Sequence, residues 1–192
     1  YPVADAVRKL YASGATYTLT YPDATNRLFT MTVTFANQGQ RAFEGASRDQ
    51  VRITTSLAED GQTPSVRFAD EFLDLSTLTY RGTVSDDGSY AVATATSPMP
   101  TTARSGASGP LHTETVYADA TKAVALSRTD ASWTLSAIDA GSAWFCQNDV
   151  KTPSSPSATA SNGSLCYWVT TAGNVATLKL TSQTGTGTVT FQ

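Results

Sequence analysis

The chain has 192 residues, of which 40% are hydrophobic, and a formal net charge of −3. This apolar content is enough for a packed core, which excludes a disordered tail. Lysine and arginine are not clustered, which argues against a nucleic-acid partner. No apolar run approaches the ~20 residues that a membrane-spanning helix needs. No signal peptide is recognisable, and the opening residues look like the start of a mature or trimmed domain.

The first predicted element is a short helix over residues 3–13. Val3, Val7 and Leu10 recur there at the spacing of one helix face. Gly14 follows directly and is typical of a helix C-terminus. We expect this to be the one substantial helix of the chain.

After the helix, the hydrophobic period changes to two. Tyr17 and Leu19 alternate with threonines, and so do Phe29 and Met31. Such alternation is typical of antiparallel strands with one buried and one solvated face. Strands are predicted over 17–21, 28–35, 50–58 and 65–75, followed by a hairpin over 77–96 that turns at Asp87-Gly88.

A connector rich in Pro, Gly and Ser, residues 97–110, separates this strand group (15–96) from a second group (111–192). Strands of the second group are predicted over 111–118, 123–138, 143–147, 165–171, 174–182 and 188–192. The pattern predicts an all-β fold, an antiparallel β-sandwich or barrel with one short N-terminal helix. We expect a single domain over 1–192, because neither half is comfortably long enough to fold alone.

The only two cysteines, Cys146 and Cys166, bracket a Ser-, Thr- and Pro-rich stretch that is predicted to be a long flexible loop. Aromatic residues flank both cysteines: Trp144, Phe145, Tyr167 and Trp168. We predict a disulfide at the base of the loop, anchored in the core by these aromatics, and hence an oxidising compartment. The alternative is two free buried thiols. No zinc-ligand spacing is present, and we predict no metal and no cofactor.

Candidate catalytic chemistry is sparse. The single histidine, His112, has Ser105, Ser108 and Glu114 near it in sequence, but "RSGASGP" is not a nucleophile elbow. We therefore expect a half-exposed histidine at a strand entry and predict no catalytic residue. Paired carboxylates could instead hydrolyse glycosides or bind calcium. These acidic residues are expected to be solvated edge and turn residues: Asp70, Glu71, Asp74, Asp86 and Asp87.

Five aromatic residues could form either a ligand platform or part of the core: Tyr117, Trp133, Trp144, Tyr167 and Trp168. Trp133 shares the parity of Leu135 and is expected to face the core. The residues predicted to contact a ligand or partner are Trp144, Tyr167 and Trp168.

The C-terminal part of the chain is almost uncharged. From Thr152 to the end, Lys179 is the only charged residue. If these strands form a sheet edge, that edge lacks the charges that normally block pairing with another chain. Strand addition to a neighbouring subunit is therefore an alternative to a position within the sheet.

The second half of the chain, together with its first residues, resembles a set of Gram-negative bacterial envelope lipoproteins. The resemblance rests on "SGPL", on "TVYAD", on a tryptophan-containing strand and on the pair "CQN" and "CYW"; "YPVADAV" resembles the residues that come after their lipidated leader. It implies a soluble β-domain tethered to an envelope membrane, with no known activity to transfer. A fainter resemblance, to pilin-like subunits, rests on the late cysteine pair.

The sequence thus predicts a non-enzymatic binding or structural module that is extracellular, periplasmic or tethered to the outer membrane. Its partner would be a protein, a glycan or a second copy, and a membrane would be reached only through a removed lipid anchor. One alternative is a self-assembling pilus, fibre or adhesin subunit, which a monodisperse monomer at high concentration would contradict. Another is a small-ligand carrier with an apolar barrel pocket, which a filled core would contradict.

Overall fold

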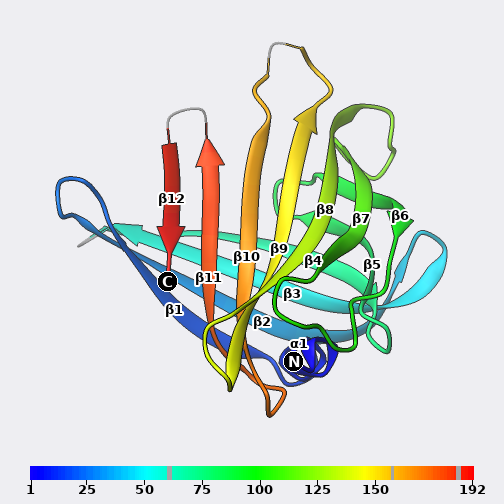
Figure 1. Ribbon diagram of the computed structural model, residues 1–192. Coiled ribbons are helices and arrows are strands. Elements are labelled where there is room, and N and C mark those ends of the chain that lie inside the picture. The colour runs from blue at the N-terminus through cyan, green and yellow to red at the C-terminus, as the bar shows by residue number, and fades with distance from the viewer. Residues whose placement is uncertain (60–61, 157, 185–186) are drawn as a thin grey trace.

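A computed structural model describes residues 1–59, 62–156, 158–184 and 187–192. In these described ranges, one helix precedes twelve strands that follow one another in a single antiparallel sheet (Figure 1). The elements are α1 (Val3–Ser13), β1 (Ala15–Pro22), β2 (Leu28–Phe43), β3 (Ala46–Glu59), β4 (Ser65–Asp74), β5 (Thr79–Ser85), β6 (Tyr90–Thr96), β7 (Ser108–Tyr117), β8 (Ala125–Ala137), β9 (Ser142–Pro153), β10 (Ser161–Thr170), β11 (Val175–Thr184) and β12 (Gly187–Phe191). The predicted all-β class is confirmed.

The sheet curls into a nearly closed barrel rather than a sandwich (Figure 1). Its two ends meet where Thr20 of β1 and Gln192, next to β12, exchange backbone hydrogen bonds of 3.0 and 3.3 Å. Two residues further along this antiparallel seam, Pro22 lacks the N–H that the next pair would need. The seam is therefore short. β6 and β7 pair directly across the predicted connector, which places both strand groups in one continuous sheet.

The helix α1 has the predicted bounds, and it lies inside one end of the barrel (Figure 1). Gly14 ends it with φ 71°, a conformation that glycine adopts at little cost. A Cβ at this position would lie 2.8 Å from the carbonyl oxygen of Phe35. Glycine is therefore needed both for the backbone angle and for the close approach to β2. Within the described residues, no helix is long and apolar enough to cross a membrane.

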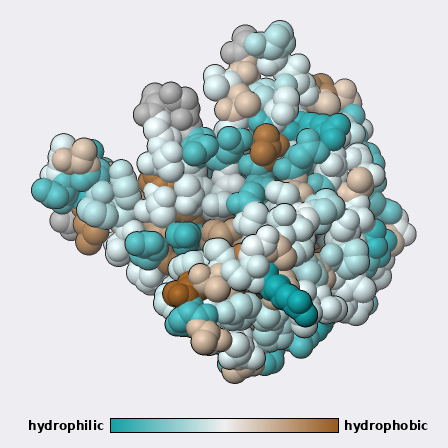
Figure 2. Space-filling view, in the orientation of Figure 1, coloured by the Kyte–Doolittle hydropathy of each residue, from teal (hydrophilic) through white to brown (hydrophobic). Residues whose placement is uncertain are grey.

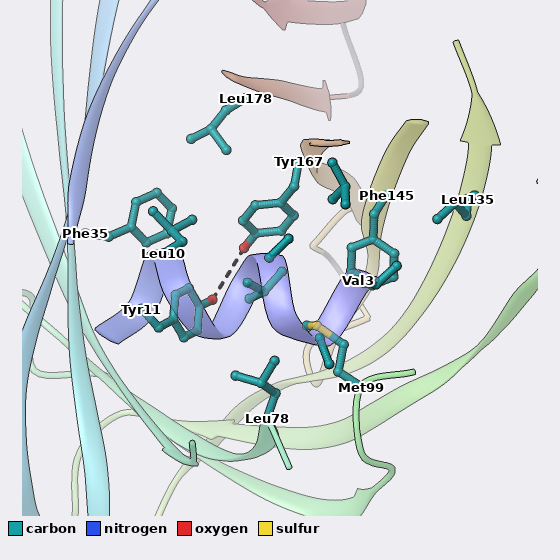
Figure 3. Packing of buried hydrophobic residues seen from close by; sticks show 14 of the residues in the cluster. Val3, Leu10, Tyr11, Phe35, Leu78, Met99, Leu135, Phe145, Tyr167 and Leu178 are labelled. Carbon is teal, nitrogen blue, oxygen red and sulfur yellow. Dashed lines mark hydrogen bonds between the residues drawn. The ribbon is translucent and has the colours of Figure 1, made fainter. Parts of the chain in front are cut away.

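The apolar face of α1 forms the centre of the core (Figure 3). Val3 and Val7 are fully buried, and they share one cluster with Phe145 and Tyr167 from β9 and β10. The hydroxyl groups of Tyr11 and Tyr167 lie 3.4 Å apart, within hydrogen-bonding distance. The side chains of the helix thus fill this end of the barrel, which would be hollow without them.

The hairpin of β2 and β3 is much longer than predicted. Alternation fades after Phe35 because the continuation is largely exposed, and a register shift at Gly39 interrupts the period. At the hairpin tip, Phe43 stacks on Phe72 at 4.4 Å and on Tyr90 at 5.3 Å between ring centroids. The tip thereby builds a second apolar cluster that period-two reasoning could not find.

The prediction of a long flexible loop between the two cysteines is mostly wrong. β9 continues to Pro153 and β10 begins at Ser161, so that the polar stretch forms a long hairpin. The predicted disulfide is present, and Cys146 lies directly opposite Cys166 in the β9–β10 register. Hydroxyl-rich residues can form strands here because both backbones find ladder partners, although few of the side chains are buried.

Candidate functional site

The predicted contact residues fall on two faces of the sheet. Trp144 and Trp168 are opposite each other in register, and their rings pack edge to face at 5.4 Å. The ammonium group of Lys179 lies 4.7 Å from the centroid of the Trp144 ring. Both tryptophans are only partly exposed on the outer face, which in the view of Figure 2 is mostly hydrophilic to neutral, with scattered hydrophobic spots. Tyr167 points inward and is fully buried, because neighbouring strand residues face opposite ways.

The interior of the barrel contains a cavity of about 170 Å³, here called the inner cavity. Its lining is polar on some sides and apolar on others. The polar and aromatic lining residues include Tyr11, Glu71, Tyr80, His112, Glu114 and Asp149, and the apolar ones are Leu73, Leu78, Met99 and Leu111. Figure 3 shows that Tyr11 projects from α1 and that Leu78 and Met99 lie beside the helix. None of the five aromatics considered from the sequence belongs to this lining.

The inner cavity adjoins a second one, of about 350 Å³, here called the outer cavity. The two share Thr83, Glu114 and Asp149 in their linings. The outer cavity also touches Gly163 and Lys151, near the ends of β9 and β10 that lie away from α1. The helix therefore occupies one end of the barrel, and the two cavities occupy the interior on its other side.

Glu71 is one of three carboxylates among the described residues that line the inner cavity. It faces inward from β4, and the hydroxyl of Tyr11 donates a 3.2 Å hydrogen bond to its Oε2 atom. Burial raises the pKa of Glu71 to about 7, and the negative charges of Asp149 and Glu114 act in the same direction. The Tyr11 hydrogen bond opposes this shift but does not overcome it.

Glu114 lies on β7, where it accepts a 2.5 Å hydrogen bond from the hydroxyl of Tyr80. Burial raises the pKa of Glu114, while Tyr80, Thr129 and the charge of Lys151 lower it in part. The Tyr80 ring also stacks on His112, with 4.0 Å between the ring centroids. Burial lowers the pKa of His112 to about 4, so that its imidazole is neutral at neutral pH.

Asp149 is the third carboxylate. Solvent reaches its side chain, yet it lies between the barrel walls, where desolvation and the charge of Glu114 raise its pKa to about 6. Within the described chain, the carboxylate of Asp149 accepts no hydrogen bond. The buried Nδ1 atom of His112 is likewise without a partner among those residues. The inner cavity thus presents acceptors that the protein itself leaves unused.

The acidic residues singled out in the sequence separate into different roles. Asp70 forms a two-point ion pair with Arg52, and Asp74 pairs with Arg48 and Arg81. Those two are ion-paired rather than merely solvated. The expectation was wrong for Glu71, which faces the interior because it alternates with Asp70 along β4. The turn role of Asp87 is confirmed by its hydrogen bond from the Ser89 amide.

A nucleophile–base pair is not found at His112 in the part of the chain that the structure describes. The hydroxyl of Ser105 accepts the amide of Ala137 instead, at 3.1 Å. His112 is neither alone on the surface nor bonded to a serine; it lies partly buried at the inner cavity. Across the described ranges, no group of three or more His, Cys, Asp or Glu side chains is placed to hold a metal ion.

Sequence reasoning did not single out Asp149 and gave Glu114 only a weak catalytic role. The available signal was the alternation of faces along a strand. Asp149 lies on the same face as Gln147 and the buried Phe145, and Glu114 lies on the same face as His112. The sequence does not point to Asp149 because its Ser-, Thr- and Pro-rich segment predicts a loop, and a loop has no inward face.

Comparisons of the chain with protein-family models, curated proteins and solved structures find no match. The resemblance to envelope lipoproteins stays a prediction. The contents of the barrel are therefore the basis on which a function can be proposed.

Glu71→Gln is expected to stabilise the protein at neutral and alkaline pH. The folded-state pKa of Glu71 is raised from 4.5 to about 7, so its favourable contribution is complete below about pH 4.5 and is lost as the pH rises through 7. At ~1.4 kcal/mol per pKa unit, the free energy of unfolding of the variant should exceed that of the wild type by ~2–3 kcal/mol near pH 8. The difference should vanish near pH 4. Urea unfolding at several pH values measures it.

His112 contributes an opposite dependence of stability on pH in the same experiment. Because its pKa is lowered from 6.5 to about 4, the contribution of His112 is complete above about pH 6.5 and is lost as the pH falls through 4. Asp130→Asn, at an exposed carboxylate of β8, is the control and should show no gain at pH 8. A Glu71→Gln protein less stable than the wild type at pH 8 would contradict the assignment.

Proposed function

We propose that this chain is a non-enzymatic binding module that holds a small molecule inside its barrel. The observation that carries the proposal is the inner cavity, which combines an apolar floor beside α1 with carboxylates that the protein leaves partly unpaired. Small-molecule sites are concave and largely apolar, with a few placed polar groups. Groups with strongly shifted pKa values concentrate at such sites.

A purely structural role accounts less well for these residues. Burying a carboxylate without full pairing costs free energy, and burial raises the pKa of Glu71. An aliphatic residue at this position would stabilise the barrel better. Unfavourable polar choices inside a fold are expected where function requires them.

The disulfide is compatible with an oxidising compartment. We infer that the module works in the periplasm, outside the cell or tethered to the outer membrane. The proposed ligand differs from the sequence-based carrier alternative, in which an apolar cavity was expected. Here the helix fills one end of the barrel, and the inner cavity beside it combines an apolar wall with carboxylates. The paired tryptophans of the outer face stay a candidate contact for a protein or glycan.

Blocking the outer cavity should abolish small-molecule binding. Gly163 lies on β10 between Asp149 and Ser182 in register, and all three line the outer cavity. A Cβ there would meet its nearest atom, the oxygen of Thr181, at 3.6 Å, which is ordinary contact. Gly163→Phe should therefore fold while its ring fills the outer cavity, through which we expect a ligand to reach the inner cavity.

Ser164→Phe is the matched control, because the next residue along β10 faces outward. The probes are benzylamine, benzyl alcohol and benzoate, followed by ligand-observed NMR and calorimetry. At least one should bind the wild type and the Ser164→Phe protein but not the Gly163→Phe protein. Binding of none of the three, or equal binding to both variants, would overturn the proposed function.

A further inference from the structure

We propose that the inner cavity selects a small amphipathic cation, namely an amine whose ammonium group meets the carboxylates while a short apolar body packs against the aliphatic wall. This inference rests on the proposed function and specifies its ligand class. It draws on four features: the charge balance, the free acceptors, the apolar wall and the size of the cavity.

The charge balance of the inner cavity favours a cation. Glu71, Glu114 and Asp149 all line it, and no lysine or arginine is found among its described lining residues. Lys151 lies in the outer cavity, where its charge acts on Glu114. An anionic ligand would meet repulsion from three carboxyl groups, whereas a cation would supply the charge that is missing.

The free acceptors favour an ammonium group over a metal ion. In the described structure, the Glu71 carboxylate accepts a hydrogen bond from Tyr11 at its Oε2 atom only, and the Asp149 carboxylate has no hydrogen-bond partner. These carboxylates come from different strands and do not converge into a metal-binding group within that part of the chain. An ammonium group carries three donors that can point toward separate acceptors. The partnerless Nδ1 of neutral His112 adds one further polar atom at the cavity wall.

The apolar wall and the size favour an organic amine over ammonium itself. Leu73, Leu78, Met99 and Leu111 line the same cavity as the carboxylates. The volume of about 170 Å³ is comparable with an engineered apolar cavity of ~150 Å³ that admits benzene. A ring or a short alkyl chain therefore fits beside the wall while its ammonium group reaches the acidic side.

Affinity for such a cation should fall with acidification, because the carboxylates must be ionised to attract it. The groups that face Glu71 are Tyr11 from α1, Tyr80 from β5, Glu114 from β7, Asp149 from β9 and Tyr167 from β10. The only cation acting on this set is Lys151, through Glu114, among the described residues. As the pH falls, Glu71 is protonated around pH 7 and Asp149 around pH 6, and each step weakens the attraction.

Calorimetry with benzylamine, benzyl alcohol and benzoate, matched in ring size, tests this selection on the full chain. Near pH 8, benzylamine should bind at least ~10-fold more tightly than the alcohol, and benzoate more weakly still. Asp149→Asn and Glu71→Gln should each weaken benzylamine by ~10-fold or more, while the outer-face variant Asp130→Asn leaves it unchanged. Lowering the pH to about 5 should weaken the amine but not the alcohol.

The outcomes separate the two proposals. If benzyl alcohol or benzoate binds as tightly as benzylamine and Gly163→Phe still blocks it, the cation selection is wrong and the binding function stands. If amine binding survives both Asp149→Asn and Glu71→Gln, the carboxylates are not its partners and the selection is overturned. Thermal unfolding of each variant shows whether a loss of binding comes from a loss of fold.

Discussion

Phe145→Ala is expected to lower the free energy of unfolding by ~3–5 kcal/mol, as is typical of large-to-small changes at buried aromatic positions. Phe145 has no exposed surface, and its ring packs between Trp133 and Tyr167, with 5.8 and 6.3 Å between ring centroids. It belongs to the cluster that joins β9 to the apolar face of α1. Its removal would leave a cavity where the helix and the barrel wall meet.

The neighbouring Trp144→Ala is the matched control. Trp144 is the larger side chain, but it faces outward, is partly exposed and contacts Trp168 and Lys179. Aromatic pairs and cation–π contacts are each worth ~0.5–1.5 kcal/mol, so the loss should be ~1–2 kcal/mol. Urea unfolding with a shared slope compares the two. Equal losses would mean that the faces of β9 are wrongly assigned.

Removal of the disulfide is expected to cost ~2–4 kcal/mol. Cys146 and Cys166 lie opposite each other on the outer face of the β9–β10 hairpin and are 20 residues apart in sequence. In the loop-closure model, cross-linking a loop of about this size lowers the entropy of the unfolded chain and so stabilises the folded state by ~3 kcal/mol. The double variant Cys146→Ser and Cys166→Ser should show this loss in urea unfolding.

A reductant provides the control for the disulfide experiment. Reduced wild type should unfold at the same urea concentration as the double serine variant, and that variant should not respond to the reductant. Because the bridge faces away from the cavities, the folded variant should still bind benzylamine. If the reductant does not change the free energy of unfolding of the wild type, the disulfide does not constrain the unfolded chain.

Local pattern was a reliable guide wherever one face of an element is buried. The helix over Val3–Ser13 and its stop at Gly14 followed from spacing alone. The strand containing Met31 and Val33 also followed, because its inward side chains are apolar and its outward ones are threonines. Prediction failed in the hairpin around Phe43, because the rings on which Phe43 stacks are distant in sequence. It also failed in the stretch after Cys146, where neither face is strongly apolar and ladder partners keep the chain extended.

The candidate site lay beyond such reasoning for a related reason. Period-two alternation says that Glu71 shares a face with Leu73, but it does not say which strands stand across the barrel from β4. Only the closed topology brings Glu71, Glu114 and Asp149 from β4, β7 and β9 to one cavity. Burial raises the pKa values of all three, and the charge of Glu114 adds to this for Glu71 and Asp149; both effects are properties of that enclosure.

The amino-acid sequence by itself determined the all-β class, the N-terminal helix and the pairing of two lone cysteines, because each depends on residues that are close in sequence or have no other partner. The tertiary structure alone decided that the sheet curls into a barrel, that the helix fills one end and that acidic side chains share the rest. Those outcomes depend on contacts between distant strands, and local propensity carries no information about which distant side chains will meet.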